Sequence, residues 1–133
     1  MEQIDLLRKP TAILVDDHPA VLDAACKIVQ KDFEIVATAG NGQMALQAVI
    51  QHRPALLVLD ITMPGWSGFE TARRVMEASP ATKILFLSVF EDIDYMAKAR
   101  EMGASYVVKR RILNDLLIAA HQTLTGIPFF SGL

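Results

Sequence analysis

The sequence predicts an α/β domain with a doubly wound, five-stranded parallel sheet and five helices. The first observation is a set of short apolar runs without polar alternation, such as residues 55–59, which are typical of strands buried on both faces of a parallel sheet. The second is that segments with helical spacing of apolar residues alternate with these runs, as crossovers between parallel strands require. A length of 133 residues suits one such domain.

Composition narrows the class of protein. The chain is 52% hydrophobic and 21% charged, and no apolar run approaches the ~18 residues of a membrane span. The N-terminus carries acids and lacks the order of a signal peptide, so the cytoplasm is the expected location. A single cysteine, Cys26, excludes an internal disulfide and is expected to be a half-buried packing residue. The net charge of −2 gives no electrostatic footprint for nucleic acid, so direct DNA binding by this chain is not expected.

The first half of the chain divides into two strand–helix pairs. Residues 1–10 are expected to form an N-terminal arm, and residues 12–16 the first strand. Pro19 suits the first turn of a helix that runs to about Lys31. Residues 33–39 are the second strand. The apolar faces of the two helices are predicted to be Val21, Leu22, Ala25, Ile28 and Val29, then Met44, Ala45, Ala48 and Val49.

The second half repeats the pattern three times. Residues 55–59 form the third strand, which leads to Asp60 and is broken by Pro64 and Gly65, and residues 83–88 and 106–109 form the fourth and fifth. Gly103 and Gly126 end the last two helices, so residues 11–126 make the domain and residues 127–133 a tail or the start of a linker. The predicted inner faces of the third and fifth helices are Phe69, Ala72, Val75 and Met76, then Ile112, Leu113, Leu116, Leu117, Ala120 and Leu124.

Reactive side chains follow four of the five predicted strands. In parallel α/β sheets the ligand site lies beyond the carboxyl ends of the strands. Polar groups at the ends of buried strands cost folding free energy unless they share a binding partner there. The residues at these ends are Asp16, Asp17, Asp60, Ser88 and Lys109.

Three carboxylates brought together need a cation, and their oxygen ligands favour Mg²⁺. A lysine and a hydroxyl beside a magnesium-bound carboxylate suit a phosphoryl group, with Asp60 as the nucleophile. The structural alternative is a core ion pair between Lys109 and the acids, with Ser88 capping the next helix.

Several segments carry a resemblance to a known family. VDDHP, VLDITMPGWSGFE, LFLSV and GASYVVKR resemble the receiver domains of response regulators in two-component signalling, over residues 11–125. The MPG-x-SG loop and residues 126–131 resemble the NarL/FixJ subfamily, whose receivers usually precede a LuxR-type helix-turn-helix that these 133 residues do not include. The resemblance implies a flavodoxin-like fold with strand order 2-1-3-4-5.

The resemblance also assigns roles to the strand-end residues. It implies that Asp60 is the phosphoacceptor and that Asp16, Asp17 and Asp60 hold Mg²⁺ together with the backbone carbonyl of Thr62. Ser88 and Lys109 would contact the phosphoryl oxygens.

Signalling in this family implies a switch and partners. Tyr106 falls at the position of the switch aromatic, which turns inward when the Ser88 hydroxyl is drawn toward the phosphoryl group. A sensor histidine kinase or a phosphotransfer protein would supply the phosphate. The fourth helix, fifth strand and fifth helix would pass the signal to a transcriptional output domain or another partner, and a homodimer is a possible assembly. Catalysis would be confined to the domain's own aspartate, so the chain would not be an enzyme.

Two other functions stay open. A magnesium-dependent phosphatase of the haloacid-dehalogenase type also uses an aspartyl nucleophile, but its Asp-x-Asp spacing is missing because Asp16 and Asp17 are adjacent and Thr62 stands two residues after Asp60. A binding module that signals without phosphate is the other, and the intact set of acids with Lys109 argues against it.

Two residues depart from the family pattern, and two others have a role that the pattern does not assign. Arg110 follows Lys109 where many receivers have proline, so the loop geometry is left open, and Arg110 and Arg111 could alter the partner-facing surface. His18 could be a metal ligand, but packing at the helix entry is favoured. Trp66 is expected to be a partly exposed aromatic residue.

Overall fold

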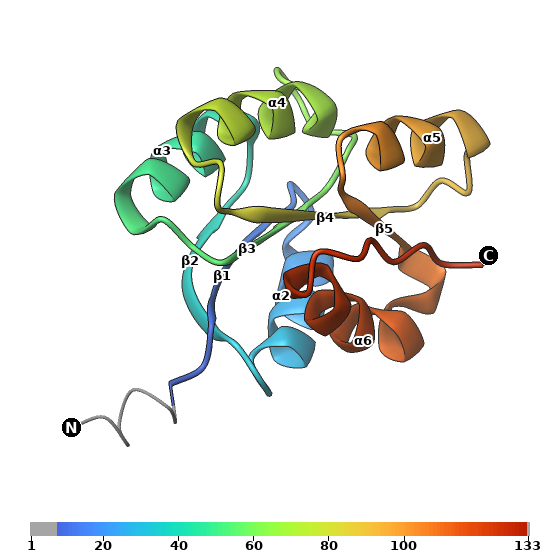
Figure 1. Cartoon of the computed structure of the whole chain (residues 1–133), viewed down its shortest axis with the longest axis horizontal. Coiled ribbons are helices and arrows are strands. Elements are labelled where there is room, and N and C mark those ends of the chain that lie inside the picture. The colour runs from blue at the N-terminus through green and yellow to red at the C-terminus, as the bar shows by residue number, and fades with distance from the viewer. Residues whose placement is uncertain (1–7, 133) are drawn as a thin grey trace.

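The computed structural model describes residues 8–132, and the rest of the predicted arm, residues 1–7, lies outside this part of the chain. Within it, one parallel sheet has the order β2-β1-β3-β4-β5, as expected (Figure 1). Registers such as Val15 beside Leu59 and Ser88 beside Val108 align the carboxyl ends of neighbouring strands. The strands are β1 (Thr11–Val15), β2 (Glu34–Ala39), β3 (Leu56–Leu59), β4 (Lys83–Ser88) and β5 (Ser105–Val108).

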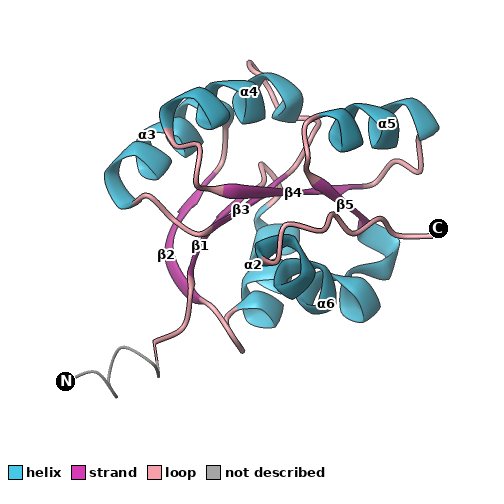
Figure 2. Cartoon of the chain, viewed as in Figure 1, coloured by secondary structure: helices cyan, strands magenta, loops and turns pink. Residues whose placement is uncertain are grey.

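Helices cover both faces of the sheet. α3, α4 and α5 lie on one face, and α2 and α6 lie on the other (Figure 2). None of the helices in residues 8–132 combines the length and apolar character that a membrane span needs. The helices are α2 (Pro19–Val29), α3 (Gly42–His52), α4 (Gly68–Ala78), α5 (Ile93–Glu101) and α6 (Ile112–Leu124), with a 3₁₀ turn η1 (Lys109–Arg111) before α6.

The continuous apolar runs fill two cores. In β3, Leu57 packs with the α3–α4–α5 layer, whereas Leu56 and Val58 pack with α2 and α6. Alternate side chains of a strand point to opposite faces, so a strand between two helical layers has to be apolar throughout. This explains why the sequence shows runs rather than alternation.

Three side chains expected on inner helix faces are exposed, so their assignment was wrong. Met44 is 52% exposed, Met76 38% and Leu113 84%. Ala45 and Val49 form the buried stripe of α3, and Met44, one residue earlier, points off it. Met76 is likewise one residue beyond the buried Val75 of α4. Leu113 lies in the first turn of α6, directly after η1, and the buried face starts with Asp115 and Leu116.

Gly68 sets how closely α4 approaches the end of β3. Its N–H donates to the carbonyl of Ile61 at 2.7 Å, and a Cβ on Gly68 would lie 2.2 Å from the backbone oxygen of Asp60 and 2.7 Å from the Cα of Ile61. Both obstacles are backbone atoms, which cannot rotate away. The glycine therefore holds the helix against the loop that carries Asp60.

We expect Gly68→Ala to lower the free energy of unfolding by about 2–3 kcal/mol, because backbone has to move to admit the methyl group. Urea unfolding followed by circular dichroism measures this. Gly40→Ala is the matched control, since a Cβ there meets nothing within 4 Å and such a change usually stays within about 0.5 kcal/mol. Equal midpoints for the two variants would contradict the close approach.

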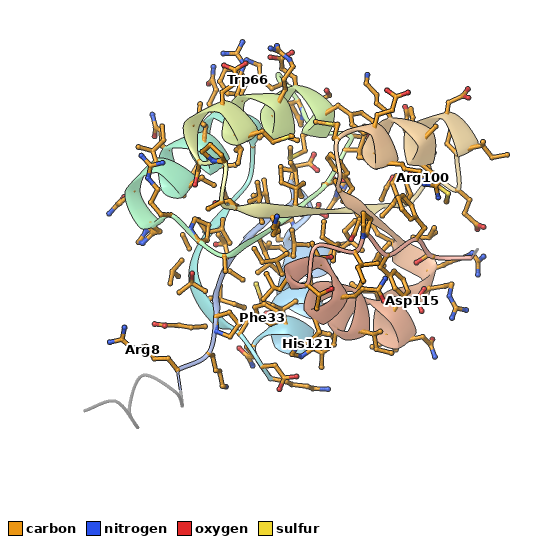
Figure 3. All side chains as sticks on the ribbon, in the orientation of Figure 1. Arg8, Phe33, Trp66, Arg100, Asp115 and His121 are labelled. Carbon is orange, nitrogen blue, oxygen red and sulfur yellow. The ribbon has the colours of Figure 1, made fainter. Side chains whose placement is uncertain are left out.

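The segment predicted as a tail lies along β5. The N–H of Tyr106 donates to the carbonyl of Phe129 at 2.8 Å, and the N–H of Ser131 donates to the carbonyl of Tyr106 at 2.9 Å. The buried Ser131 hydroxyl accepts from the N–H of Val108 at 3.1 Å and donates to Asp115 at 2.7 Å. The guanidinium of Arg100 stacks 4.4 Å from the ring centre of Phe130; Arg100 and Asp115 are labelled in Figure 3. Residues 128–131 therefore pack as part of the domain.

Candidate functional site

The side chains predicted at the strand ends meet at one edge of the sheet. Asp16 directly follows β1, Asp60 follows β3, Ser88 ends β4 and Lys109 follows β5. Asp16, Asp60 and Ser88 are buried, with 5%, 4% and 1% exposure. Because the strands are parallel, their carboxyl ends share this edge, and the apolar runs before these residues fix where each one emerges.

Lys109 is the cation of this cluster. Its Nζ lies 2.8 Å from Asp16 Oδ2 and 3.5 Å from Asp60 Oδ1, and its side chain is only 11% exposed. The ion pair between Lys109 and the acids, which the structural alternative predicts, is therefore present. The capping part is wrong, because Asp92 caps α5 by accepting hydrogen bonds from the N–H groups of Asp94 and Tyr95.

The buried position of Asp60 changes its acidity. Burial raises the pKa of its carboxyl group, the ammonium of Lys109 opposes this rise, and the neighbouring carboxylate of Asp16 adds to it. The net shift of the pKa is upward, so one lysine does not offset the cost of burial and the repulsion from Asp16.

The acidic group has oxygen atoms that fit a divalent cation. Asp16 Oδ2 and Asp17 Oδ1 are buried without a partner in hydrogen-bonding geometry, although Lys109 lies close to the former. One ligand atom from each of Asp16, Asp17, His18 and Asp60 lies within 4.8 Å of the others. Carboxylate oxygens at this density suit a hard ion such as Mg²⁺. Thr62 lies at the same edge, two residues after Asp60, and its carbonyl stays a predicted ligand.

His18 lies at the helix entry beside Pro19, as expected, but it does not pack there. It is 66% exposed, so the favoured interpretation as a packing residue was wrong. Its N–H donates to Asp16 Oδ1 at 2.9 Å, and its Nδ1 lies 3.2 Å from that oxygen and 3.1 Å from Asp17 Oδ1. The only sequence signal was its position directly after the two acids.

The two predicted switch residues are linked through Phe90. The hydroxyl of Ser88 accepts from the N–H of Phe90 at 3.1 Å, and the Tyr106 hydroxyl donates to the carbonyl of Phe90 at 2.6 Å. Tyr106 is fully buried, so its ring points inward in this structure. Burial raises the pKa of Tyr106, and the Ser88 hydroxyl opposes that shift. The loop after β4 therefore connects the two side chains.

The residues after Lys109 form ion pairs with their neighbours. No peptide bond between residues 8 and 132 is cis, so the bond from Lys109 to Arg110 is trans. Arg110 pairs with Glu91 in the loop before α5, and Arg111 binds Asp115 with two hydrogen bonds, at 2.9 and 3.2 Å. Arg110 thus joins η1 to the loop before α5, whereas the pair of Arg111 and Asp115 lies at the start of α6.

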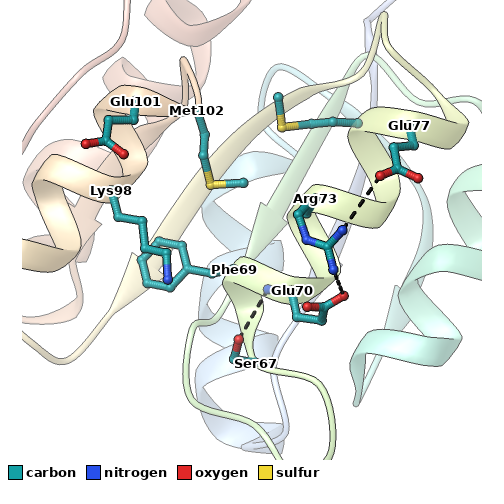
Figure 4. Close-up of a pocket in the computed structure, with 9 residues that line it drawn as sticks. Ser67, Phe69, Glu70, Arg73, Glu77, Lys98, Glu101 and Met102 are labelled. Atoms are coloured by element: carbon teal, nitrogen blue, oxygen red, sulfur yellow. Dashed lines mark hydrogen bonds and ion pairs between the residues drawn. The ribbon is translucent and has the colours of Figure 1, made fainter.

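A groove of about 600 Å³ lies between α4 and α5, and Asp16, Asp17 and Asp60 are not among its lining residues (Figure 4). Phe69, Met76 and Met102 contribute apolar surface to it, and the Lys98 ammonium lies 4.8 Å from the ring centre of Phe69. None of the strand-end residues lines this groove. Trp66, in the loop before α4, is partly exposed as expected and stacks 4.0 Å from the guanidinium carbon of Arg74.

This chain belongs to the response regulator receiver domain family, whose model matches residues 12–122. It is 37% identical over 118 residues to the oxygen regulatory protein NreC of Staphylococcus epidermidis. The matched region covers 86% of this chain and 54% of NreC. The chain thus spans about half the length of the curated relatives it matches.

Solved structures agree with this membership. A two-component response regulator of the LuxR family from Aurantimonas sp. SI85-9A1 superimposes with a TM-score of 0.87 at 29% identity, over 93% of this chain and 91% of that one. The signal receiver domain of NarL from Mycobacterium tuberculosis superimposes with a TM-score of 0.83 at 24% identity, over 90% and 98%, and shows the same fold. The expected membership in the receiver family is confirmed, and the likeness to a LuxR-family regulator agrees with the expected subfamily.

Proposed function

We propose that this receiver domain accepts a phosphoryl group on Asp60 from a histidine kinase or a phosphotransfer protein. The observation that carries the proposal is the convergence of Asp60 with Lys109, Asp16 and Asp17 at one edge of the sheet. Family membership supports it.

The chain's own residues supply most of the chemistry. A carboxylate oxygen of Asp60 attacks phosphorus as the bond to the donor nitrogen breaks, and the negative charge then spreads over the phosphoryl oxygens. Lys109, held by Asp16, offers its ammonium to those oxygens. Ser88 offers a hydroxyl from the next strand end. A bound Mg²⁺ would neutralise the carboxylates and draw the phosphoryl oxygens toward Asp60, with Asp16, Asp17, Asp60 and the Thr62 carbonyl as the residues to hold it.

The arrangement supports self-phosphorylation better than the other two functions. An aspartyl phosphatase needs a second acid two residues after its nucleophile, and Thr62 stands at that place. A module that never takes phosphate would need Lys109 only as an ion-pair partner of Asp16 and Asp60, and it would have no need for the further carboxylate of Asp17 beside them. We therefore propose that the domain is a signalling phosphoacceptor and not an enzyme that turns over other molecules.

The direct test is to incubate the protein with a small acyl phosphate and Mg²⁺ and to measure its intact mass. We expect a mass gain of one phosphoryl group that requires Mg²⁺ and is prevented by a chelator. A full gain in the presence of chelator would contradict the metal site, and no gain under any condition would contradict the phosphoacceptor function.

Mg²⁺ should also stabilise the fold. A ligand that binds only the native state at ten times its dissociation constant adds ~1.4 kcal/mol, which raises the melting temperature of a domain of this size by about 3–6 °C. Melting curves with Mg²⁺ and with chelator measure this. Asp17→Asn should abolish the difference, whereas Asp23→Asn, an exposed aspartate paired with Lys27, should keep it. Superimposed curves for the wild type would show that the site does not bind the ion.

The signal would leave through the surface that α5, β5 and α6 share. Phosphate on Asp60 would draw the Ser88 hydroxyl away from the Phe90 N–H, and Phe90 also holds Tyr106. The recipient would be a transcriptional output domain, as in the LuxR-type regulators, or a partner in the cytoplasm. Contact with DNA would then come through a helix-turn-helix outside these 133 residues, and a homodimer would use the same surface.

Ser88→Ala tests this route. The variant should still gain a phosphoryl group on Asp60, but the NMR chemical-shift changes of residues 88–108 on adding beryllofluoride and Mg²⁺ should largely disappear. Ser79→Ala is the control, because Ser79 is also buried and hydrogen-bonded but lies before β4 rather than at its end. If Ser88→Ala responds like the wild type, the coupling runs through other residues.

A further inference from the structure

We propose that His18 is a direct ligand, through Nδ1, of the cation held by Asp16, Asp17 and Asp60, and that it makes the site favour transition ions such as Mn²⁺ and Zn²⁺ over Mg²⁺. The inference shares the cation site of the proposed function and rests on it to that extent. It adds a nitrogen to a site otherwise made of oxygens.

The backbone of His18 is restrained by the chain around it. His18 is the N-cap residue of α2 and is followed by Pro19 in the first turn, whose ring restricts the backbone. Its own N–H donates to Asp16 Oδ1 at 2.9 Å. The backbone is thereby tied to one of the acids, and the ring nitrogen Nδ1 lies 3.2 Å from the same oxygen.

The distances match those between neighbouring ligands of one ion. Adjacent ligands of an octahedral ion with bonds of about 2.1 Å lie about 3.0 Å apart, and opposite ones about 4.2 Å apart. His18 Nδ1 lies 3.2 Å from Asp16 Oδ1 and 3.1 Å from Asp17 Oδ1, and the whole set with Asp60 spans at most 4.8 Å. A modest contraction of the group would satisfy one ion.

The carboxylate atoms themselves indicate a cation. Asp16 is 5% exposed, and its buried Oδ2 lies 2.8 Å from the Lys109 ammonium without hydrogen-bonding geometry. Asp17 Oδ1, the oxygen next to His18, is buried without a partner in such geometry. Buried carboxylate oxygens are costly unless a donor or a metal satisfies them. An ion bound by both acids would sit where Nδ1 can reach it.

The nitrogen ligand determines which ions bind more tightly. Mg²⁺ strongly prefers oxygen and gains little from an imidazole, whereas Zn²⁺ and neighbouring first-row ions bind imidazole well. Removing His18 should therefore weaken the binding of transition ions selectively. The ratio of Zn²⁺ to Mg²⁺ affinity is the quantity that separates this arrangement from a site of oxygens alone.

The experiment combines spectroscopy with affinity. Mn²⁺ bound to the wild type should show nitrogen coupling in pulsed EPR, and His18→Ala should lose it. In competition with a chromophoric chelator, His18→Ala should lose at least about tenfold in Zn²⁺ affinity, since changing even a residue that only hydrogen-bonds to a ligand costs about 10–100-fold. The Mg²⁺ affinity measured by calorimetry should change far less.

Two controls make the result decisive. His52→Ala removes an exposed histidine on α3, away from the acids, and should leave every value unchanged. His18→Asn keeps a residue favoured at an N-cap and should lose the coupling as His18→Ala does. Wild type that binds Mg²⁺ without nitrogen coupling to Mn²⁺, or variants with an unchanged ratio of affinities, would overturn the role of His18 alone. Wild type that binds no divalent ion would overturn it together with the metal site of the proposed function.

Discussion

Asp60→Asn should abolish the mass gain of one phosphoryl group and at the same time raise the melting temperature of the metal-free protein by a few degrees. The first effect follows because the amide is not a nucleophile for phosphorus. The second follows because burial raises the pKa of Asp60, so holding it ionised costs folding free energy. Intact mass and thermal melting in chelator measure the two effects. A variant that still gains the full mass would place the phosphoacceptor elsewhere.

The stabilisation should depend on pH in one direction. A carboxyl group whose pKa is raised on folding contributes stability below its unfolded pKa of about 3.9, and this contribution is lost as pH rises through the folded value. The advantage of Asp60→Asn over the wild type should therefore be small in acid and grow toward neutral pH. The exposed Asp23→Asn serves as the control and should show no such growth. An advantage that is constant with pH would contradict the electrostatic cause.

Lys109→Met should lower the free energy of unfolding of the metal-free protein by about 3–5 kcal/mol, the usual cost of leaving a buried charge without its partner. The ammonium lies 2.8 Å from Asp16 and 3.5 Å from Asp60, and both carboxylates are buried. Methionine keeps the apolar stem and removes only the charge. Urea unfolding in chelator measures the loss, and Lys98→Met, which removes an exposed lysine on α5, is the control.

Two further measurements identify the cause. Mg²⁺ should restore part of the stability of Lys109→Met, because another cation then meets the same carboxylates. The double variant Lys109→Met/Asp60→Asn should be more stable than the sum of the single effects predicts, since one of the repelling charges is gone. Additive effects and no response to Mg²⁺ would mean that Lys109 acts through packing alone.

The parts of the fold and site that could be predicted are those that repeat along the chain. Apolar runs marked the strands because both faces of the sheet are covered, and parallel strands bring Asp16, Asp60, Ser88 and Lys109 to one edge. His18 was misjudged because it precedes the first turn of α2, where no periodicity says which way a ring points.

Contacts between distant segments could not be predicted. Ser131 meets Asp115 across 16 residues through a single hydroxyl, and the short segment around it shows neither helical spacing nor regular alternation. Gly68 is a second example. A side chain there would collide with the backbone of the loop after β3, which lies outside the α4 pattern that the sequence shows. Such constraints arise from packing in three dimensions and leave no pattern in a single sequence.

The hydrogen bonds that residues 129–131 make to Tyr106 have a consequence for the solubility of the domain. β5 is the last strand of the sheet, and an outer strand with free N–H and C=O groups is a template on which other chains can add a strand. Phe129 and Ser131 occupy the N–H and C=O of Tyr106, so the chain shields its own sheet border. A truncation at Gly126, where helical periodicity ends, would bare that border and invite self-association, whereas one placed after Gly132 would keep it covered.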